Sequence, residues 1–472
     1  MIFSYIERSL TRKTHLINIL YCTKNQTIDT LALQLNCSPL TVLSDIEYLK
    51  TELTIPIEET DHTFQLSPTE SENLQCYLKK VYKTSLFLQF LAYFLLKDKP
   101  KFGTFVEQQH VSIAKGYRVR EEIIQYLNSI HLDIVDNNVV GDTLLIRFFI
   151  AELSRSFGIN VLSPQPEIER RCNHILDKVE NEMNIHFSKY ERELYALLID
   201  TSISSDIPNT PIIFTSAELR GINSKLYPKI YIDLVKNELA EFWAENRQEQ
   251  ELKFTIIAFI VTNSHLFDKS VNPEQSKIYQ HEFLNLPEVN SLISAITNDF
   301  KVQPQMMPYF YTAVYSFLSD SLFNLQPIFT YPVYGTTLHK TQIFHKMSNI
   351  IQQWNVFNIE IGQYRILNFC NRLTPILAPN LYKEIVILTE KVIDGNFLRD
   401  YLSTLLTDIN ISVQKDITYA QNFQAKQHIL YIIDKEFRIP FTLKRNSDNL
   451  YFVFFPIREE TLFNLLTKIF KS

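Results

Sequence analysis

The chain has 472 residues, of which 46 are Lys or Arg and 52 are Asp or Glu, so its formal net charge is −6. A hydrophobic fraction of 46% and a charged fraction of 21% are typical of a globular protein and exclude a disordered chain. There are only 8 glycines and no G-x-G-x-x-G or G-x-x-x-x-G-K-[ST] motif, which disfavours dinucleotide oxidoreductases and P-loop ATPases. Low glycine together with 34 Phe and 24 Tyr indicates a mainly helical, tightly packed chain. Its length corresponds to about three to five domains.

A local excess of positive charge lies between Lys79 and Arg120. This segment holds nine basic residues against Asp98 and Glu107, a net charge of +7 in an otherwise acidic chain. Lys and Arg displace counterions from nucleic acid, so such a run predicts a phosphate-binding surface. The alternative is a solvated helical face whose acidic partners lie elsewhere in the fold. The nine are Lys79, Lys80, Lys83, Lys97, Lys99, Lys101, Lys115, Arg118 and Arg120.

The cysteines and the apolar runs bear on the cellular compartment. The five cysteines are widely spaced and form no C-x-x-C pair, so they support neither a zinc or redox motif nor a disulfide framework. Charged residues interrupt the apolar positions of Met1–Leu20, unlike those of a signal peptide. The longest apolar runs, Leu86–Leu96 and Phe254–Val261, are shorter than the roughly 18–20 residues that span a bilayer. We expect a cytoplasmic protein with no metal, no other cofactor and no membrane partner.

Residues 11–66 have the pattern of a winged helix-turn-helix. Apolar spacing predicts three helices, at 12–21, 27–36 and 39–53. Ser38 is a good N-cap for the third helix, and Pro39 suits its first position. The residues of that helix expected in the core are Leu40, Leu43, Ile46 and Leu49. The runs 55–57 and 63–66 predict a hairpin, so the third helix would enter the major groove while the hairpin, as a wing, touches the DNA backbone.

The same pattern then recurs. Helices are expected at 85–97, at 102–109 and, after a Ser112 cap, up to about Ile130; the inward residues of the last are Ile123, Leu127 and Ile130. The runs Leu132–Val135 and Thr143–Ile146 flank turn residues that tolerate positive φ, and they predict a second wing. Two such units in tandem, the second overlapping the basic run, favour DNA binding.

The remainder divides into a helical part and a mixed part. Long amphipathic helices are expected at 167–183, 189–199, 229–243, 286–300, 308–324, 342–354 and 362–373. Beyond them, apolar runs predict strands at 385–388, 411–414, 428–433 and 451–455, with helices at 397–406 and 459–470. Strands that alternate with helices indicate a small α/β domain with a largely parallel sheet.

These parts, in this order, resemble the Mga/AtxA-type global virulence regulators of Gram-positive bacteria. The likeness covers the whole chain, and the order of domains carries more of it than any single motif. One motif is Cys37-Ser-Pro-Leu-Thr-Val-Leu-Ser-Asp-Ile46, which leads into Tyr48-Leu49. The other is Ser112…Tyr117-Arg118…Leu127 with Leu132-Asp-Ile134, followed by Gly141-Asp142…Ile146-Arg147-Phe148-Phe149.

The resemblance implies a mainly α, multidomain fold in five parts. These are a winged helix-turn-helix at 1–67, a second one of the Mga type at 68–155, two all-helical domains at 164–272 and 276–378, and an α/β domain at 380–472. The helical pair would resemble the PRD, the regulatory domain of the sugar phosphotransferase system (PTS), and the tail would resemble its EIIB domain. In the family this tail supports dimerisation, so a homodimer is expected.

The tail departs from true EIIB enzymes in one residue type. Those enzymes carry a phosphorylated Cys after the first strand. Here that strand leads into Thr389-Glu390, and no Cys follows Cys370. Thiol phosphotransfer through the tail is therefore excluded, and a structural role is expected.

Small, polar or basic residues off the apolar face of each third helix are the candidate DNA contacts. They are Ser38, Thr41, Ser44 and Lys50 in the first unit, and Ser112, Lys115, Tyr117, Arg118 and Arg120 in the second. Arg can read guanine bidentately or clamp a phosphate. Residues 1–66 hold 5 basic and 8 acidic residues, and Glu121 and Glu122 would repel phosphate. We therefore expect the main anchor in the N-terminal half of the second recognition helix.

Histidines of the PRD-like domains are the candidate phosphorylation sites that the resemblance implies. They are His174, His186, His265, His339 and His345, each of which has as its alternative a surface histidine without such a role. His339 and His345 are six residues apart and have no acidic or Cys ligand set beside them, which is poor metal spacing. No G-x-S-x-G or H-E-x-x-H motif occurs, so no enzymatic activity is expected.

The sequence thus predicts a DNA-binding transcriptional regulator. It would bind double-stranded promoter DNA through tandem winged helices and form a homodimer. PTS phosphocarrier proteins would be its further partners, acting through histidine phosphorylation of the PRD-like domains. The alternative is a PTS-linked signalling protein that acts by protein contacts without sequence-specific DNA binding.

Overall fold

The computed structural model describes most of the chain. The described residues are 2–23, 25–67, 72–162, 165–204, 211–224, 226–263, 273–300, 302, 306–323, 325, 328, 342–355, 361–377, 384–389, 391–406, 409–414, 429–434, 450–453, 462 and 465. The chain forms two compact units. The first comprises residues 1–293, 314–336 and 351–365, and the second comprises 294–313, 337–350 and 366–472.

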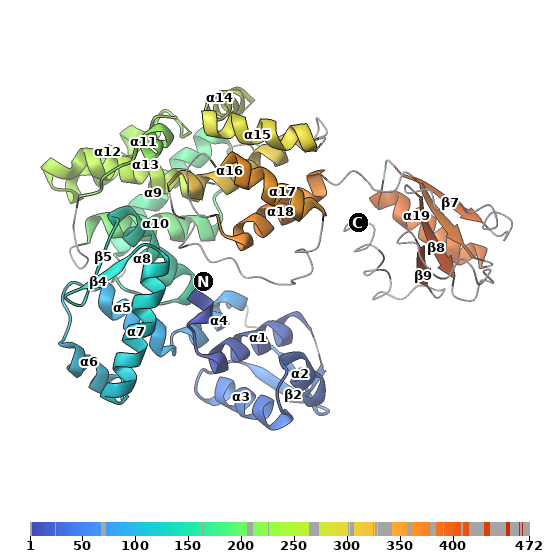
Figure 1. Ribbon diagram of the computed structural model, residues 1–472, viewed down its shortest axis with the longest axis horizontal. Coiled ribbons are helices and arrows are strands. Elements are labelled where there is room, and N and C mark those ends of the chain that lie inside the picture. Colours follow the sequence, from blue (N-terminus) through green and yellow to red (C-terminus); the bar gives the residue numbers. More distant parts are fainter. Residues whose placement is uncertain are drawn as a thin grey trace. The chain divides into compact units, whose positions relative to one another are not determined.

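The first unit begins with a helix-turn-helix and a wing (Figure 1). After a 3-10 turn at Ile2–Ser4, its helices are α1 (Arg8–Cys22), α2 (Ile28–Leu35) and α3 (Pro39–Thr51). Its strands are β1 (Gln26–Thr27), β2 (Ile57–Thr60) and β3 (Thr63–Leu66), which form an antiparallel sheet in the order β1-β3-β2. The three predicted helices and the hairpin are confirmed. Ser38 caps α3 and Pro39 lies in its first turn, also as predicted.

The buried face of α3 differs from the predicted one. Leu40 and Leu43, expected in the core, are 78% and 43% exposed. Val42 and Asp45 take inner positions instead, alongside the remaining two predicted core residues. Asp45 can lie there because two cations of α1 pair with it. The prediction was wrong because a paired carboxylate occupies a position that apolar periodicity assigns to a hydrophobic residue.

A second winged helix-turn-helix follows. Its helices are α4 (Leu74–Tyr82), α5 (Leu86–Leu95), α6 (Phe102–Gln108), α7 (Ile113–Ser129) and α8 (Thr143–Phe157), and its hairpin is β4 (Asp133–Val135) with β5 (Asn138–Val140). Ser112 caps α7, and the three predicted inward residues of this helix are buried. The predicted helices at 85–97, 102–109 and 113–130 are therefore confirmed.

The second wing is shorter than predicted. Its turn is Asp136-Asn137, both at positive φ, and its second strand ends at Val140. Thr143–Ile146 was predicted as a strand but starts α8. The Asp142 carboxylate accepts a hydrogen bond from the backbone N–H of Leu144 at 2.8 Å and caps that helix.

Helices make up the middle of the chain. They are α9 (Pro166–Met183), α10 (Lys189–Ile203), α11 (Ser216–Asn223), α12 (Tyr231–Leu239), α13 (Gln248–Thr262), α14 (Pro273–Leu284), α15 (Pro287–Asp299), α16 (Met307–Leu322), α17 (Gln342–Trp354) and α18 (Gln363–Leu377), with 3-10 turns at Ala240–Phe242 and Glu245–Arg247. The predicted helices are present, whereas α11, α13 and α14 were not predicted. Within the described part of the chain, no helix is both long and apolar enough to cross a membrane.

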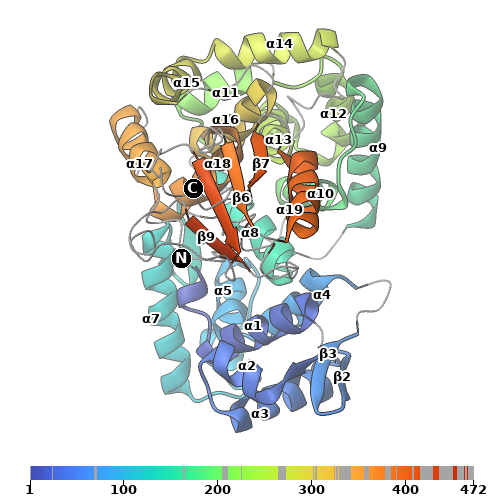
Figure 2. The ribbon, with the colours of Figure 1, turned by 90° about the vertical axis from the view of Figure 1, so that its right-hand side faces the viewer.

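The last domain is a parallel sheet with a helix, seen in Figure 2. It consists of β6 (Glu384–Leu388), α19 (Val392–Leu405), β7 (Asn410–Gln414), β8 (Ile429–Asp434) and β9 (Leu450–Val453). The strands pair in parallel in the order β7-β6-β8-β9, and α19 packs against β7 and β6. Alternate residues of β6 enter the cores on the two faces of the sheet. The α/β prediction is confirmed; most of the predicted helix 459–470 lies outside the described residues.

Candidate nucleic-acid interface

Helix α7 presents the clearest candidate surface for DNA. The Ser112 hydroxyl accepts a hydrogen bond from the backbone N–H of Lys115 at 3.3 Å and thereby fixes the first turn. Gly116 faces α6, where an added Cβ would lie 2.7 Å from Cγ2 of Val106. The close packing on α6 therefore requires glycine, and it leaves the other side of these turns open to solvent.

Three predicted contact residues in these turns are accessible to solvent. Lys115, Tyr117 and Arg118 are exposed, and 52% of Tyr117 is accessible. The ring of Tyr117 lies 5.3 Å from that of Phe102, centroid to centroid, which helps to orient it. Arg120 does not join them, because it is only partly exposed and its buried Nε has no hydrogen-bond partner among the described residues. An ammonium, a guanidinium and an aromatic ring are thus available together for phosphate and base contacts.

Only part of the basic run is open to DNA. Lys79 Nζ lies 3.2 Å from Oε1 of Glu193 on α10, and Lys80 Nζ lies 2.8 Å from Oε1 of Glu72. These two lysines have the acidic partners that the alternative interpretation of the run expected. The members of the run that are exposed are Lys83, Lys97, Lys101, Lys115 and Arg118.

Lys99 has a structural position behind the wing. Its Nζ donates to the carbonyl oxygens of Phe94, at 3.2 Å, and of Asn137, at 2.5 Å, and it lies 5.2 Å from the centre of the Tyr93 ring. Burial lowers the pKa of Lys99 to about 8. This lysine therefore ties the turn of the second wing to the end of α5, and it sets the wing's place beside α7.

The first recognition helix, α3, offers fewer charged groups. Ser38 Oγ accepts from the backbone N–H of Thr41 at 3.2 Å and lies 2.8 Å from Thr41 Oγ1, so these two hydroxyls satisfy each other in the cap. Ser44 and Lys50 are exposed. Of the four predicted contacts in this unit, Lys50 alone carries a positive charge.

Two further cations of the first unit are used to hold α3 in place. Arg12 Nε lies 2.5 Å from Oδ2 of Asp45, and Lys13 Nζ lies 3.0 Å from Oδ1 of the same carboxylate. Lys13 also lies 4.7 Å from the centre of the Tyr48 ring. These contacts fix α3 against α1, and they remove two positive charges from the set that phosphate could use.

The two recognition helices lie at the same end of the first unit. In Figures 1 and 2, α3 and the end of α7 that packs on α6 both lie at the bottom of the view. Both helices thus belong to the same end of this unit's ribbon.

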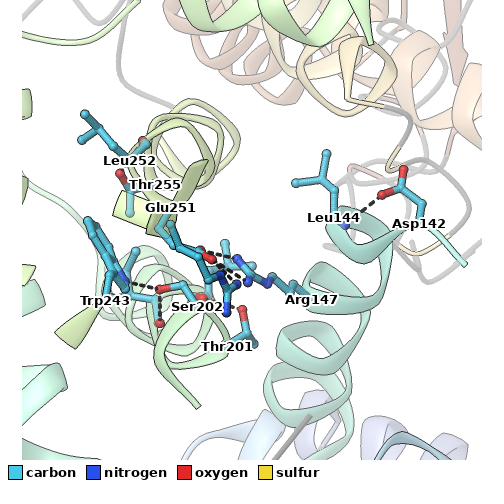
Figure 3. Close-up of polar contacts among 12 residues, drawn as sticks. Asp142, Leu144, Arg147, Thr201, Ser202, Trp243, Glu251, Leu252 and Thr255 are labelled. Carbon is cyan, nitrogen blue, oxygen red and sulfur yellow. Dashed lines mark hydrogen bonds and ion pairs between the residues drawn. The ribbon is translucent and has the colours of Figure 1, made fainter. Parts of the chain in front are cut away.

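A buried ion pair joins the second helix-turn-helix to the helices that follow it (Figure 3). Arg147 of α8 donates to Glu251 of α13 through Nη1 at 2.5 Å and Nη2 at 3.0 Å, and both side chains are 1% exposed. Arg247 also contacts Glu251, and the Arg147 guanidinium lies 4.7 Å from the centre of the Phe254 ring. The sequence motif that begins at Gly141 includes Arg147, but no local signal predicts its partner, which is 104 residues away.

Three of the five candidate histidines fall within the described residues. His174, His186 and His345 are exposed, whereas His265 and His339 lie outside that part of the chain. His174 Nδ1 lies 2.8 Å from Oε1 of Glu238 on α12. His186 Nδ1 lies 3.2 Å from Oε1 of Glu180, its own neighbour in sequence. Of these two contacts, only that of His174 joins two helices, α9 and α12.

Arginines surround His174 on its own helix. Arg170 and Arg171 precede it on α9 by one turn, and Arg171 donates to the Glu238 carbonyl oxygen at 2.8 Å and pairs with Glu241 at 2.6 Å. The contact between α9 and α12 therefore includes charged groups. Groups of three or more His, Cys, Asp or Glu able to hold a metal do not occur among the described residues.

Thr389 directly follows β6 in the parallel sheet. It is fully buried, and its Oγ1 donates to Asp434 Oδ2 at 3.0 Å and accepts from the Lys391 backbone N–H at 3.0 Å. The hydroxyl therefore joins the ends of β6 and β8 to the start of α19. This position is structural.

Comparison with known proteins identifies the second helix-turn-helix. A family model for the Mga helix-turn-helix domain matches residues 69–153, the segment that contains α4 to α7, the second wing and most of α8. No curated protein matches the chain. The matched domain supports a DNA-binding transcriptional regulator. Over residues 69–153 of its 472, the chain is similar to the Mga-like regulator family.

Proposed function

We propose that the protein binds promoter DNA through both winged helix-turn-helix units, with α7 as the main anchor, and that it has no catalytic activity of its own. The observation that carries this proposal is the exposed set Lys115, Tyr117 and Arg118 on the N-terminal half of α7. Those residues lie where a recognition helix contacts base edges and backbone. The wing turn, held by Lys99, lies on the same domain and would touch the sugar-phosphate backbone.

Salt-dependent binding tests the anchor. The double variant Lys115→Ala/Arg118→Ala is compared with the parent in gel-shift titrations on an AT-rich promoter duplex over a range of salt concentrations. Loss of two phosphate contacts lowers the slope of log K against log salt by about 2. The control, Lys189→Ala/Lys236→Ala, removes the same charge from exposed positions on α10 and α12. An unchanged affinity and slope in the α7 variant contradicts the anchor.

The helical domains are proposed to sense carbohydrate status through histidine phosphorylation, with His174 as the acceptor. The support is its exposure, its contact with Glu238, and the two arginines one turn before it. A phosphoryl group adds between one and two negative charges, which would repel Glu238 and attract Arg170 and Arg171. The α9–α12 contact would therefore change with phosphorylation.

A phosphotransfer assay with the general PTS phosphocarrier tests this sensing role. The parent chain becomes labelled and His174→Ala loses that label, while His186→Ala, the control, keeps it. Absence of label from every histidine of the parent would overturn regulation by phosphorylation while leaving DNA binding intact.

The C-terminal domain is proposed to pair protomers through α19. Ile393, Phe397 and Tyr401 are 86%, 70% and 38% exposed, and their spacing of four residues places them on one face of this helix. Light scattering of Phe397→Asp is expected to show monomers where the parent and the control, Ser403→Asp, show dimers. Dimers of Phe397→Asp at the parent's strength would contradict this assignment.

A further inference from the structure

The exposed face of α3 is apolar where a recognition helix meets base edges. Leu40 is 78% and Leu43 43% exposed, and nothing in the core of the first unit requires them to be leucine. The first six residues of α3, Pro39–Ser44, contain no charged side chain. A contact made by this stretch therefore cannot be bidentate guanine recognition by Arg or a phosphate clamp by Lys.

The register of the two recognition helices is the same. Each begins one residue after a serine whose hydroxyl accepts from the backbone N–H three residues on, at Thr41 in α3 and at Lys115 in α7. Counting from those caps, Leu43 corresponds to Tyr117 and Ser44 to Arg118. The fifth position is thus exposed and carbon-rich in both helices, whereas the sixth is cationic only in α7.

We propose that Leu40 and Leu43 read the 5-methyl groups of thymine in the major groove. This inference rests on the proposed function, in which both units contact DNA. The thymine methyl is the apolar group that base edges present in that groove, and aliphatic side chains bury against it. The division of labour follows from the charges: α7 supplies electrostatic attraction, and α3 supplies selectivity for thymine at its steps of the duplex.

Replacement of thymine by deoxyuridine tests this reading, because the two bases differ only in that methyl group. The full chain is titrated with an AT-rich promoter duplex and with the same duplex made with deoxyuridine. Affinity of the parent is expected to fall about fourfold for each methyl that the leucines bury. The variant Leu40→Ala/Leu43→Ala should bind the thymine duplex more weakly than the parent does. Its ratio of affinities for the thymine and deoxyuridine duplexes should fall by the factor that the leucines contribute.

Controls separate this inference from general DNA binding. Leu33→Ala removes a leucine that is 84% exposed on α2, outside the recognition helix, and should keep the parent's thymine preference. All three leucines are exposed, so thermal melting of the variants should match the parent. Equal affinity of the parent for both duplexes, with its salt dependence intact, overturns methyl reading and leaves DNA binding standing. So does a Leu40→Ala/Leu43→Ala variant that keeps the full thymine preference. If the parent binds neither duplex, the proposed function itself is wrong.

Discussion

The buried pair Arg147–Glu251 yields the sharpest prediction about stability. Arg147→Met removes a guanidinium that makes two hydrogen bonds to a carboxylate, where both side chains are 1% exposed. Removing one member of a buried ion pair leaves the other charge desolvated and costs about 3–5 kcal/mol. Arg247 still contacts Glu251, so we expect the lower end of that range, about 3 kcal/mol.

Replacing the other member of the pair should lower the stability of the fold further. Glu251→Leu leaves Arg147 buried without its counter-charge, and its Nε already has no hydrogen-bond partner among the described residues. We expect about 5 kcal/mol for this variant. Arg147→Met/Glu251→Leu removes both charges and should be within about 1 kcal/mol of the parent, because apolar residues of similar size pack well in place of a buried pair. The coupling between the two sites is then large and favourable.

Urea denaturation measures these differences. The chain has two tryptophans, so Trp354→Phe leaves Trp243, which is buried and donates to Ser202 Oγ at 3.2 Å in the region of the pair, as the fluorescent reporter. Arg147→Lys is the matched control, since it keeps the charge and loses the bidentate geometry; its cost should lie between those of the parent and the methionine variant. Single variants within about 0.5 kcal/mol of the parent, or a double variant as unstable as the worse single one, refute the reasoning.

Three other predictions concern a titrating carboxyl, a lysine and a cap. Burial raises the pKa of Asp200 from 3.8 to about 7, so between about pH 4 and 7 the folded chain holds a proton that the unfolded chain has released, and this contribution to stability falls as pH rises. Asp200→Asn should therefore gain in melting temperature relative to the parent between these pH values and show a constant difference above them; a difference independent of pH would contradict this. Lys99→Met should speed hydrogen exchange in β4 and β5 and leave that of β2 and β3 unchanged, because the Asn137 carbonyl loses its donor. Ser112→Ala should cost about 1 kcal/mol, and Ser112→Asp should restore most of it, in denaturation of the full chain.

Local chemistry determined much of the fold in advance. Serine caps placed the starts of α3 and α7, and helical periodicity predicted α17 with its actual bounds, Gln342–Trp354. The run of β-branched and aromatic segments near the C-terminus predicted the parallel sheet. These features succeed because capping and periodicity are set by residues within a few positions of one another.

Predictions failed where a local pattern fits two structures. Thr143–Ile146 has the composition of a strand, but the Asp142 cap and burial of the whole following segment make it the start of α8. On α3, apolar spacing predicted that Leu40 and Leu43 are buried. It could not predict that Asp45 is buried in their place, because burial of that carboxylate depends on Arg12 and Lys13 of another helix.

By itself, the sequence determined the helices of the two helix-turn-helix units, the α/β composition of the last domain and the region of positive charge between Lys79 and Arg120. Only the tertiary structure decided which of those charges are open. Lys79 and Lys80 pair with acidic residues and Lys99 holds a wing, whereas Lys115 and Arg118 remain exposed. The physical reason is that charge is a property of a residue, whereas its availability to DNA depends on the partners that the fold brings to it, which can be distant in sequence, as with Lys79 and Glu193 at a separation of 114.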